Sequence, residues 1–169
     1  MDQPRYSTSG MRGIALGGVE FKQCELPVDN LVGKPGQGLE TTLKAFQLTR
    51  VALPGMFSAI LDSGLRLTLK HCRTRRLYNK PASELPQVRA RLAESFVDLL
   101  LCDAFVSVAA NAAHVVPAEL NLYGSAVKAL VPAVLVTAMD SLASVLGAHS
   151  YVREGKWRSF RSCYVICNR

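Results

Sequence analysis

Apolar residues recur at helical spacing along much of this 169-residue chain. In the first such stretch, at about residues 39–69, the apolar positions are Leu39, Leu43, Phe46, Leu53, Phe57, Ile60 and Leu61. Residues three and four apart share one face of a helix, so this spacing predicts an amphipathic helix. Pro54 lies inside the pattern and predicts a kink, because it removes one backbone hydrogen bond.

Two further helices are predicted after the loop "RRLYNKPA". Ser83 is a suitable N-cap for the second helix, and Pro86 suits its first turn. The apolar face of this helix is formed by Val88, Leu92, Phe96, Leu99 and Leu100. The third helix is expected from about Pro117 to Gly147, with the glycine as its C-cap. Long helices with short connections predict a mainly α fold, an antiparallel up-and-down bundle.

The text before the first helix differs, because residues 10–33 alternate as a strand does. Val19, Phe21, Cys24 and Leu26 lie near a two-residue repeat and are followed by the turn-like "PVDN". One or two strands cannot form a stable sheet alone. We therefore expect a short β segment before the bundle, with residues 1–34 as the remnant of a β-domain and residues 35–155 as the helical domain.

The end of the chain, residues 156–169, reads "KWRSFRSCYVICNR" and shows little periodicity. A bundle of three helices calls for a fourth helix at this point. The sequence instead predicts an atypical tail. One hypothesis is that the reading frame or the gene was disrupted here, and the alternative is a divergent but genuine tail.

The formal net charge is +7, and the basic residues cluster in the tail and in "KHCRTRR", residues 70–76. This second cluster is consistent with a solvated helix end, with a phosphate-binding site for a cofactor or ligand, or with a nucleic-acid patch. No aromatic residue is interleaved with it as a base-stacking surface would need, which disfavours nucleic acid.

Membrane insertion and secretion are not expected. The most apolar stretch, "AVKALVPAVLVTAMDSLASVLG", is interrupted by Lys128, Pro132 and Asp140. The N-terminal "MDQPRYSTSG" lacks the apolar core of a signal peptide. The five cysteines are then best interpreted as reduced thiols, and the chain as cytoplasmic.

Few side chains offer catalytic or metal chemistry by their spacing alone. Cys163 and Cys167 are four apart, but nothing nearby completes a zinc site. His71, His114 and His149 are isolated in the sequence, and we expect them at the surface or at helix ends.

An ordered set of short motifs nevertheless resembles one family. The segment "GMRGIALGGVEFKQCELPVDNLVGKPGQGLETTLKAFQLTR" resembles the junction between the middle β-domain and the C-terminal helical domain of the acyl-CoA dehydrogenases. "HCRTRRLYN" resembles the family's segment with an Arg followed by an aromatic-Gly pair, and "LGAHSYVREG" resembles its glycine-rich turn. The resemblance runs from Gly10 to Gly155 and stops after "REG".

This resemblance implies FAD as the cofactor and an acyl-CoA thioester, or an acyl-carrier thioester, as the substrate. The implied reaction is dehydrogenation across the CH–CH bond next to the thioester. It also implies a homo-oligomer, a dimer or tetramer, with electron-transfer flavoprotein as a candidate redox partner. Neither nucleic acid nor a membrane is expected as a partner.

Residue roles follow from the resemblance position by position. Arg75 would meet the FAD pyrophosphate of a neighbouring subunit, with Tyr78 and the backbone near Gly147 along the same cofactor. An Arg side chain suits phosphate oxygens because its N–H groups form a planar fork.

The same resemblance assigns a substrate site to the first helix. Phe46, Thr49 and Arg50 would line the acyl-CoA site, with Arg50 near the CoA phosphates.

Departures from the family pattern are equally specific. Asn79 replaces a Gly, and Pro86 stands where many members have a Gln that contacts FAD. The family's catalytic base is a Glu after the glycine-rich turn or just before the substrate-binding Arg. This chain has no carboxylate after Glu154, and the other position is Thr49. We therefore expect the isolated chain to be a poor catalyst. The alternative function is a non-catalytic helical scaffold or oligomerisation module.

Overall fold

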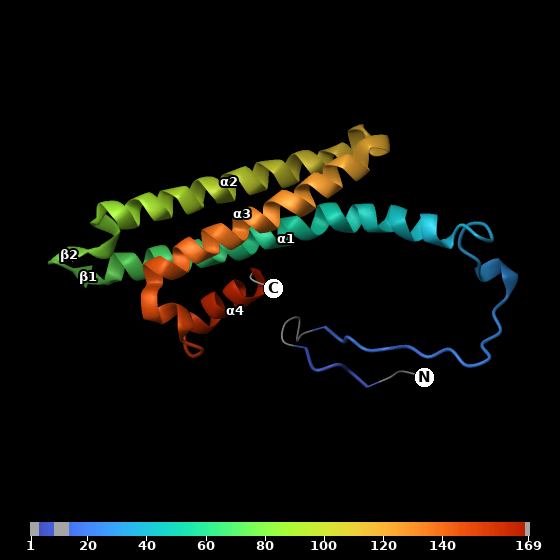
Figure 1. The fold of residues 1–169 in the computed structure, drawn as a ribbon, viewed down its shortest axis with the longest axis horizontal. Coiled ribbons are helices and arrows are strands. Elements are labelled where there is room, and N and C mark those ends of the chain that lie inside the picture. The colour runs from blue at the N-terminus through green and yellow to red at the C-terminus, as the bar shows by residue number, and fades with distance from the viewer. Residues whose placement is uncertain (1–3, 9–13, 168–169) are drawn as a thin grey trace. The chain divides into compact units, whose positions relative to one another are not determined.

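The computed structural model describes residues 4–8 and 14–167. The chain divides into two units, Met1–Leu43 and Lys44–Arg169. The second unit contains nearly all of the helical structure, in which three long helices run alternately up and down and a shorter helix follows (Figure 1). The predicted mainly α, antiparallel bundle is confirmed.

Over its described residues, the first unit contains no β-strand, although its alternating sequence predicts one. Among its described residues, only Val19 is assigned to β-structure, as a single bridge, and a short 3-10 helix, η1, spans Val28–Asn30. Gln23 adopts a left-handed backbone with φ of 45°, which interrupts an extended strand. Phe21 and Leu26 are exposed, so the alternation has no second layer to pack against. The family-like segment Gly10–Gly13 lies outside the described residues.

Helix α1 (Gly38–Thr74) confirms the first predicted helix and extends it to Thr74. It continues through Pro54, whose side chain is fully buried. The predicted apolar face is only partly correct, because Leu39, Phe46 and Leu53 are exposed. The buried positions lie further along the helix: Val51, Pro54, Ser58, Leu61, Gly64, Leu65, Thr68, His71 and Cys72.

A short β-hairpin connects α1 to the next helix. Strands β1 (Arg76–Leu77) and β2 (Lys80–Pro81) pair antiparallel, with Arg76 opposite Pro81 and Leu77 opposite Lys80. The two turn residues, Tyr78 and Asn79, have φ of 52° and 60°. Two consecutive left-handed residues are typical of the tight turn that matches strand twist. Asn tolerates this conformation better than other non-glycine residues, which explains how it replaces the family's Gly.

Helix α2 (Pro86–Val115) and helix α3 (Leu120–Leu146) are joined by the 3-10 helix η3 (Pro117–Glu119). Pro86 is the first residue of α2 as predicted, but Ser83 is not its N-cap. Ser83 lies in the preceding 3-10 helix, η2 (Ala82–Glu84), and Leu85 occupies the cap position. Helix α3 ends at the predicted place, since Gly147 has φ of 61° and its N–H donates to the carbonyl of Ala143.

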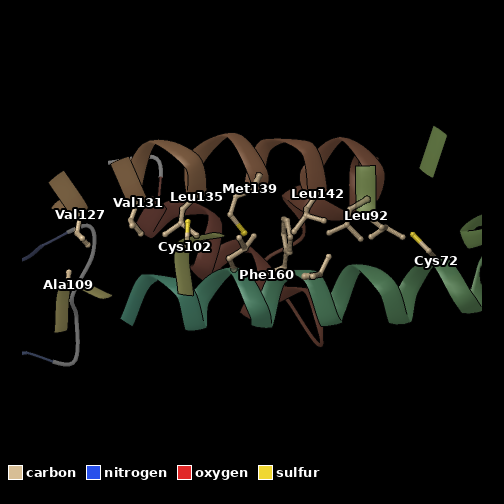
Figure 2. Close-up of a cluster of buried hydrophobic side chains, with 14 of the residues drawn as sticks. Cys72, Leu92, Cys102, Ala109, Val127, Val131, Leu135, Met139, Leu142 and Phe160 are labelled. Carbon is tan, nitrogen blue, oxygen red and sulfur yellow. The ribbon is translucent and has the colours of Figure 1, made fainter. Parts of the chain in front are cut away.

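The core of the second unit is built around α3. Figure 2 shows Val131, Leu135, Met139 and Leu142 pointing from α3 toward α1, at spacings of three and four residues. Gly64 on α1 permits a close approach, because a Cβ there would come within 2.9 Å of the Met139 sulfur.

The expected atypical tail is instead a helix, α4 (Trp157–Cys167), that follows the 3-10 helix η4 (Gly147–Tyr151). Phe160 is fully buried against the core and lies beside Met139 and Leu142 (Figure 2). The sequence analysis missed this helix because arginines and serines separate its apolar residues. Trp157, Phe160, Cys163 and Tyr164 nevertheless follow helical spacing and pack against the core.

Two segments are long and apolar enough to cross a membrane by length and composition: Pro86–Val115 and Pro117–Tyr151. The expectation that polar residues exclude the most apolar stretch as a membrane span is therefore wrong by length and composition. The core helix of a soluble protein passes the same test, so the finding carries little weight by itself.

Candidate cofactor- and substrate-binding sites

The last turns of α1 and the hairpin form an exposed basic end, made by Lys70, Arg73, Arg75, Arg76 and Lys80. The backbone of Arg75 is fixed on both sides. Its N–H donates to the carbonyl of His71 at 2.9 Å, and its carbonyl accepts from the N–H of Ala82 at 2.8 Å. In the part of the chain that the structure describes, the recorded ion pairs involve Lys22 and Arg66 and none of these five side chains. Their positive charges are therefore available to an anion.

Tyr78 and Gly147 lie at the same end of the bundle as Arg75. Tyr78 occupies the tip of the hairpin, with its side chain 88% exposed. Gly147 begins η4, and this segment reaches the end of α1, because the rings of His149 and His71 are 4.8 Å apart. Figure 1 shows the end of α3 and the hairpin gathered at one end of the second unit. The three predicted cofactor residues therefore share one end of the second unit.

The predicted substrate residues lie near the beginning of α1. Phe46 and Thr49 are exposed, and Arg50 is half-buried. The start of α3 packs against this part of α1. The Gln47 side-chain amide donates to Asn121 Oδ1 at 3.0 Å, and a Cβ on Gly124 would lie 3.5 Å from Arg50 Cβ.

The two predicted sets do not form one site within a single chain. Arg50 and Thr74 lie on the same helix and are separated by about 36 Å at 1.5 Å per residue. Arg75 follows Thr74 directly, so the cofactor residues and the substrate residues are at different ends of α1.

The family resemblance allows a general base just before Arg50 or after the glycine-rich turn. Thr49 precedes Arg50, and its hydroxyl donates to the carbonyl of Ala45 at 3.5 Å. Glu154 is exposed in the segment between η4 and α4. Over the described residues, no group of three or more His, Cys, Asp and Glu side chains could hold a metal ion.

We do not expect the thiols of Cys72, Cys102 and Cys163 to act as nucleophiles. Burial raises the pKa values of Cys72, Cys102 and Cys163, which favours the protonated, unreactive form. A cavity of about 520 Å³ lies in the first unit, lined by Arg5, Tyr6, Ser7, Thr8 and Ile14. None of the six predicted site residues lines it.

His71 and His149 lie in the last turns of α1 and η4, which agrees with the expectation of helix ends, but the two side chains are not isolated from each other. Their rings lie 4.8 Å apart, and each is 4.9 Å from the ring of Trp157. His71 is buried, and His114 is exposed at the end of α2. Sequence reasoning missed this cluster because its members come from three different elements, with no shared motif.

Comparison with known proteins identifies the family to which this arrangement belongs. The family model "Acyl-CoA dehydrogenase, C-terminal domain" matches residues 36–165, so the chain belongs to the acyl-CoA dehydrogenase family. The match continues through most of α4. The expectation that the resemblance ends at Gly155 is therefore wrong, and the hypothesis of a disrupted reading frame loses the observation that motivated it.

Individual relatives are distant. The chain is 23% identical over 145 residues to cyclohex-1-ene-1-carbonyl-CoA dehydrogenase of Syntrophus aciditrophicus, which covers 86% of this chain and 35% of that protein. It is 31% identical over 84 residues to L-prolyl-[peptidyl-carrier protein] dehydrogenase of Pseudomonas fluorescens, covering 50% of this chain and 22% of the relative. The chain thus spans well under half the length of the curated relatives it matches.

The fold matches a solved member of the family. Butyryl-CoA dehydrogenase from Megasphaera elsdenii superposes with a TM-score of 0.87 at 15% identity, covering 99% of this chain and 44% of that one.

Proposed function

We propose that this chain supplies the C-terminal helical part of an FAD-dependent dehydrogenase that acts on the CH–CH bond of an acyl thioester. Membership of the acyl-CoA dehydrogenase family supports this reaction class. The relatives' names include CoA thioesters and a peptidyl-carrier thioester, so either carrier is consistent with the proposal.

The observation that carries the proposal is the exposed basic end around Arg75. A guanidinium there, fixed at its backbone and unpaired among the described residues, can form two parallel hydrogen bonds to a pyrophosphate. We propose that Arg75 contacts FAD, with the Tyr78 ring and the backbone of Gly147 alongside it. The residues present fit an anionic cofactor, because the surrounding side chains are basic.

The substrate residues are proposed to serve a different FAD molecule from the one that Arg75 contacts. Phe46 offers an exposed apolar ring for the acyl chain, and Arg50 offers a cation for the CoA phosphates. The separation of about 36 Å along α1 supports this division. Arg75 then completes the cofactor site of a neighbouring copy in a homo-oligomer.

Catalysis requires two partners for the substrate's hydrogens. FAD, when bound, accepts a hydride, and a general base must remove the neighbouring proton. This chain binds and orients the thioester through Phe46 and Arg50, but Thr49 cannot serve as the base at neutral pH. We therefore expect very low dehydrogenase activity from this chain alone, and electron-transfer flavoprotein remains the proposed electron acceptor.

Flavin retention tests the proposal. The chain is incubated with FAD, the excess is removed by gel filtration, and the dissociation constant is measured by flavin fluorescence. Arg75→Ala should weaken binding by about tenfold to a hundredfold, the usual cost of losing a hydrogen bond to a charged group. Arg73→Ala removes an exposed cation two residues away and should change affinity by less than about threefold. Equal losses in both variants, or no retained flavin, would reject the role of Arg75.

A non-catalytic scaffold is the second candidate function. The exposed apolar residues of α2, such as Phe96 and Leu100, favour it. A colourless preparation that self-associates would support this candidate over the first.

A further inference from the structure

Three aromatic side chains meet where the end of α1, η4 and the start of α4 come together. His71 comes from α1, His149 from η4 and Trp157 from α4. The three ring-to-ring distances are 4.8, 4.9 and 4.9 Å, and the indole meets His71 edge-on at 83°. We define these residues as the imidazole–indole cluster. It is a direct contact between the first turn of α4 and the long helices.

The charged and titratable groups that act on His71 are all basic. They are His149 from η4, Arg75 from the end of α1 and Lys156 from the segment before α4. The Lys156 ammonium also lies 4.8 Å from the centre of the Trp157 ring. A proton added to His71 would therefore meet positive charge from η4, from the end of α1 and from the segment before α4.

His71 is also poorly prepared to carry a charge. Its side chain is 8% exposed, and its Nε2 atom is buried with no hydrogen-bond partner. Burial, followed by the neighbouring positive charges, lowers the pKa of this imidazole. An unfolded histidine has a pKa of about 6.5 and takes up a proton more readily than the packed His71. The packed state is therefore favoured over the released state above about pH 6.5, and this advantage is lost as the pH falls toward the lowered pKa of His71.

We propose that the imidazole–indole cluster is an acid-sensitive latch, which holds α4 on the bundle at neutral pH and releases it when the buried imidazole of His71 is protonated. The segment before α4 is suited to such a movement. Residues 152–156 are exposed, and Gly155 has φ of 56°, a conformation that glycine adopts without strain. This latch goes beyond the proposed dehydrogenase function and does not depend on it.

Release of α4 would uncover apolar surface. Phe160 is fully buried beside Gly64 and Met139, so its departure would open the seam between α1 and α3. Tyr164 is the second attachment of α4, because its hydroxyl hydrogen-bonds to Asp140 on α3. At least three contacts thus hold α4: the imidazole–indole cluster, Phe160 and Tyr164. The proposed pH dependence belongs to the cluster.

Hydrogen exchange measured by mass spectrometry tests the latch without any flavin. Protection of α4 is compared at about pH 7.5 and about pH 5.5, either side of the ordinary histidine pKa, after correction for intrinsic exchange rates. The native chain should lose protection several-fold in α4 on acidification, with α2 unchanged. A double variant, His71→Phe with His149→Phe, keeps the aromatic contacts and should retain protection at both values.

If the double variant folds poorly, a single variant and a control still test the latch. His149→Phe alone leaves His71 in place and should reduce the acid-induced loss. His114→Gln removes the exposed third histidine and should leave the loss unchanged. Equal protection of α4 at both pH values in the native chain would overturn the latch, as would the same acid-induced loss in the phenylalanine variants.

Discussion

Helices α2 and α3 have similar lengths, and both contain long apolar stretches, yet the bundle uses them differently. Helix α3 buries nine positions, spread from Leu120 to Leu146, whereas α2 buries five. Helix α3 has α1, α2 and α4 around it, as the core cluster shows. Helix α2 turns one side toward α3 and leaves these large apolar residues exposed: Phe96, Val97, Leu100, Leu101 and Val108. Apolar composition therefore identifies helices that need partners, and the fold decides which helix finds them within the chain.

The outer apolar residues of α2 fit the proposed homo-oligomer. Large contiguous apolar patches on a monomer commonly mark interaction sites. Family membership supports oligomerisation, and the inner side of α2 is already occupied by α3. The comparison between the two helices can be tested directly, because each contains leucines that differ mainly in burial.

The largest effect is expected from shortening a core leucine on α3. Leu142 is fully buried, so Leu142→Ala should lower the free energy of unfolding by about 2–5 kcal/mol. The matched variant on α2, Leu100→Ala, should change the free energy of unfolding of the monomer by less than about 0.5 kcal/mol, because Leu100 is 53% exposed. Urea denaturation at low protein concentration measures both. Similar losses of unfolding free energy in the two variants would contradict the conclusion that Leu142 of α3 lies in the core and Leu100 of α2 lies outside it.

The next largest effect on stability is expected from weakening the packing of α4 against α3. Phe160→Ala should lower the free energy of unfolding by about 3 kcal/mol. This loss is at the low end for a buried Phe, because a terminal helix can detach while the rest of the protein stays folded. Hydrogen exchange should show lost protection in α4 and in the adjoining part of α3, with α2 unaffected. Tyr151→Ala, at an exposed position, is the control. An unchanged α4 would mean that Phe160 does not hold it.

A charge placed on the outer side of α2 should have the smallest effect on folding and the largest effect on self-association. Leu100→Glu should leave the helical circular dichroism intact and weaken self-association at least about tenfold, or 1.4 kcal/mol. Ser144→Glu places the same charge at an exposed position of α3 and should leave association unchanged. Sedimentation velocity over a range of concentrations gives the association constants. Equal weakening by both substitutions would remove α2 from the interface.

The sequence predicts the three long helices because each has many apolar residues at helical spacing and clear end signals, such as Pro86 and Gly147. It predicts the buried face of α2 poorly, since apolar residues occur on more than one side of that helix. Leu92 is buried as expected, but Phe96 and Leu100 are not. Helix α4 was missed because eleven residues offer too few repeats to stand out among arginines and serines.

The candidate sites show a similar division. Arg75 could be placed at a helix end from the sequence, and it directly follows α1. Tyr78 could be placed only in a loop, and it lies at the tip of the hairpin. The alternation of residues 10–33 suggested a strand, but a strand needs neighbours, and Gln23 turns the backbone into a left-handed conformation. The contact between His71, His149 and Trp157 depends on how α1, η4 and α4 pack, which periodicity along one segment does not reveal.

In the proposed assembly, the exposed side of α2 joins copies of this chain, and Arg75 then serves a neighbour's cofactor. Size-exclusion chromatography with light scattering tests this assembly when flavin absorption is recorded across the same peak after incubation with FAD. We expect a particle of at least twice the mass of one chain, with flavin eluting in that peak. A monomer that elutes without flavin would contradict it.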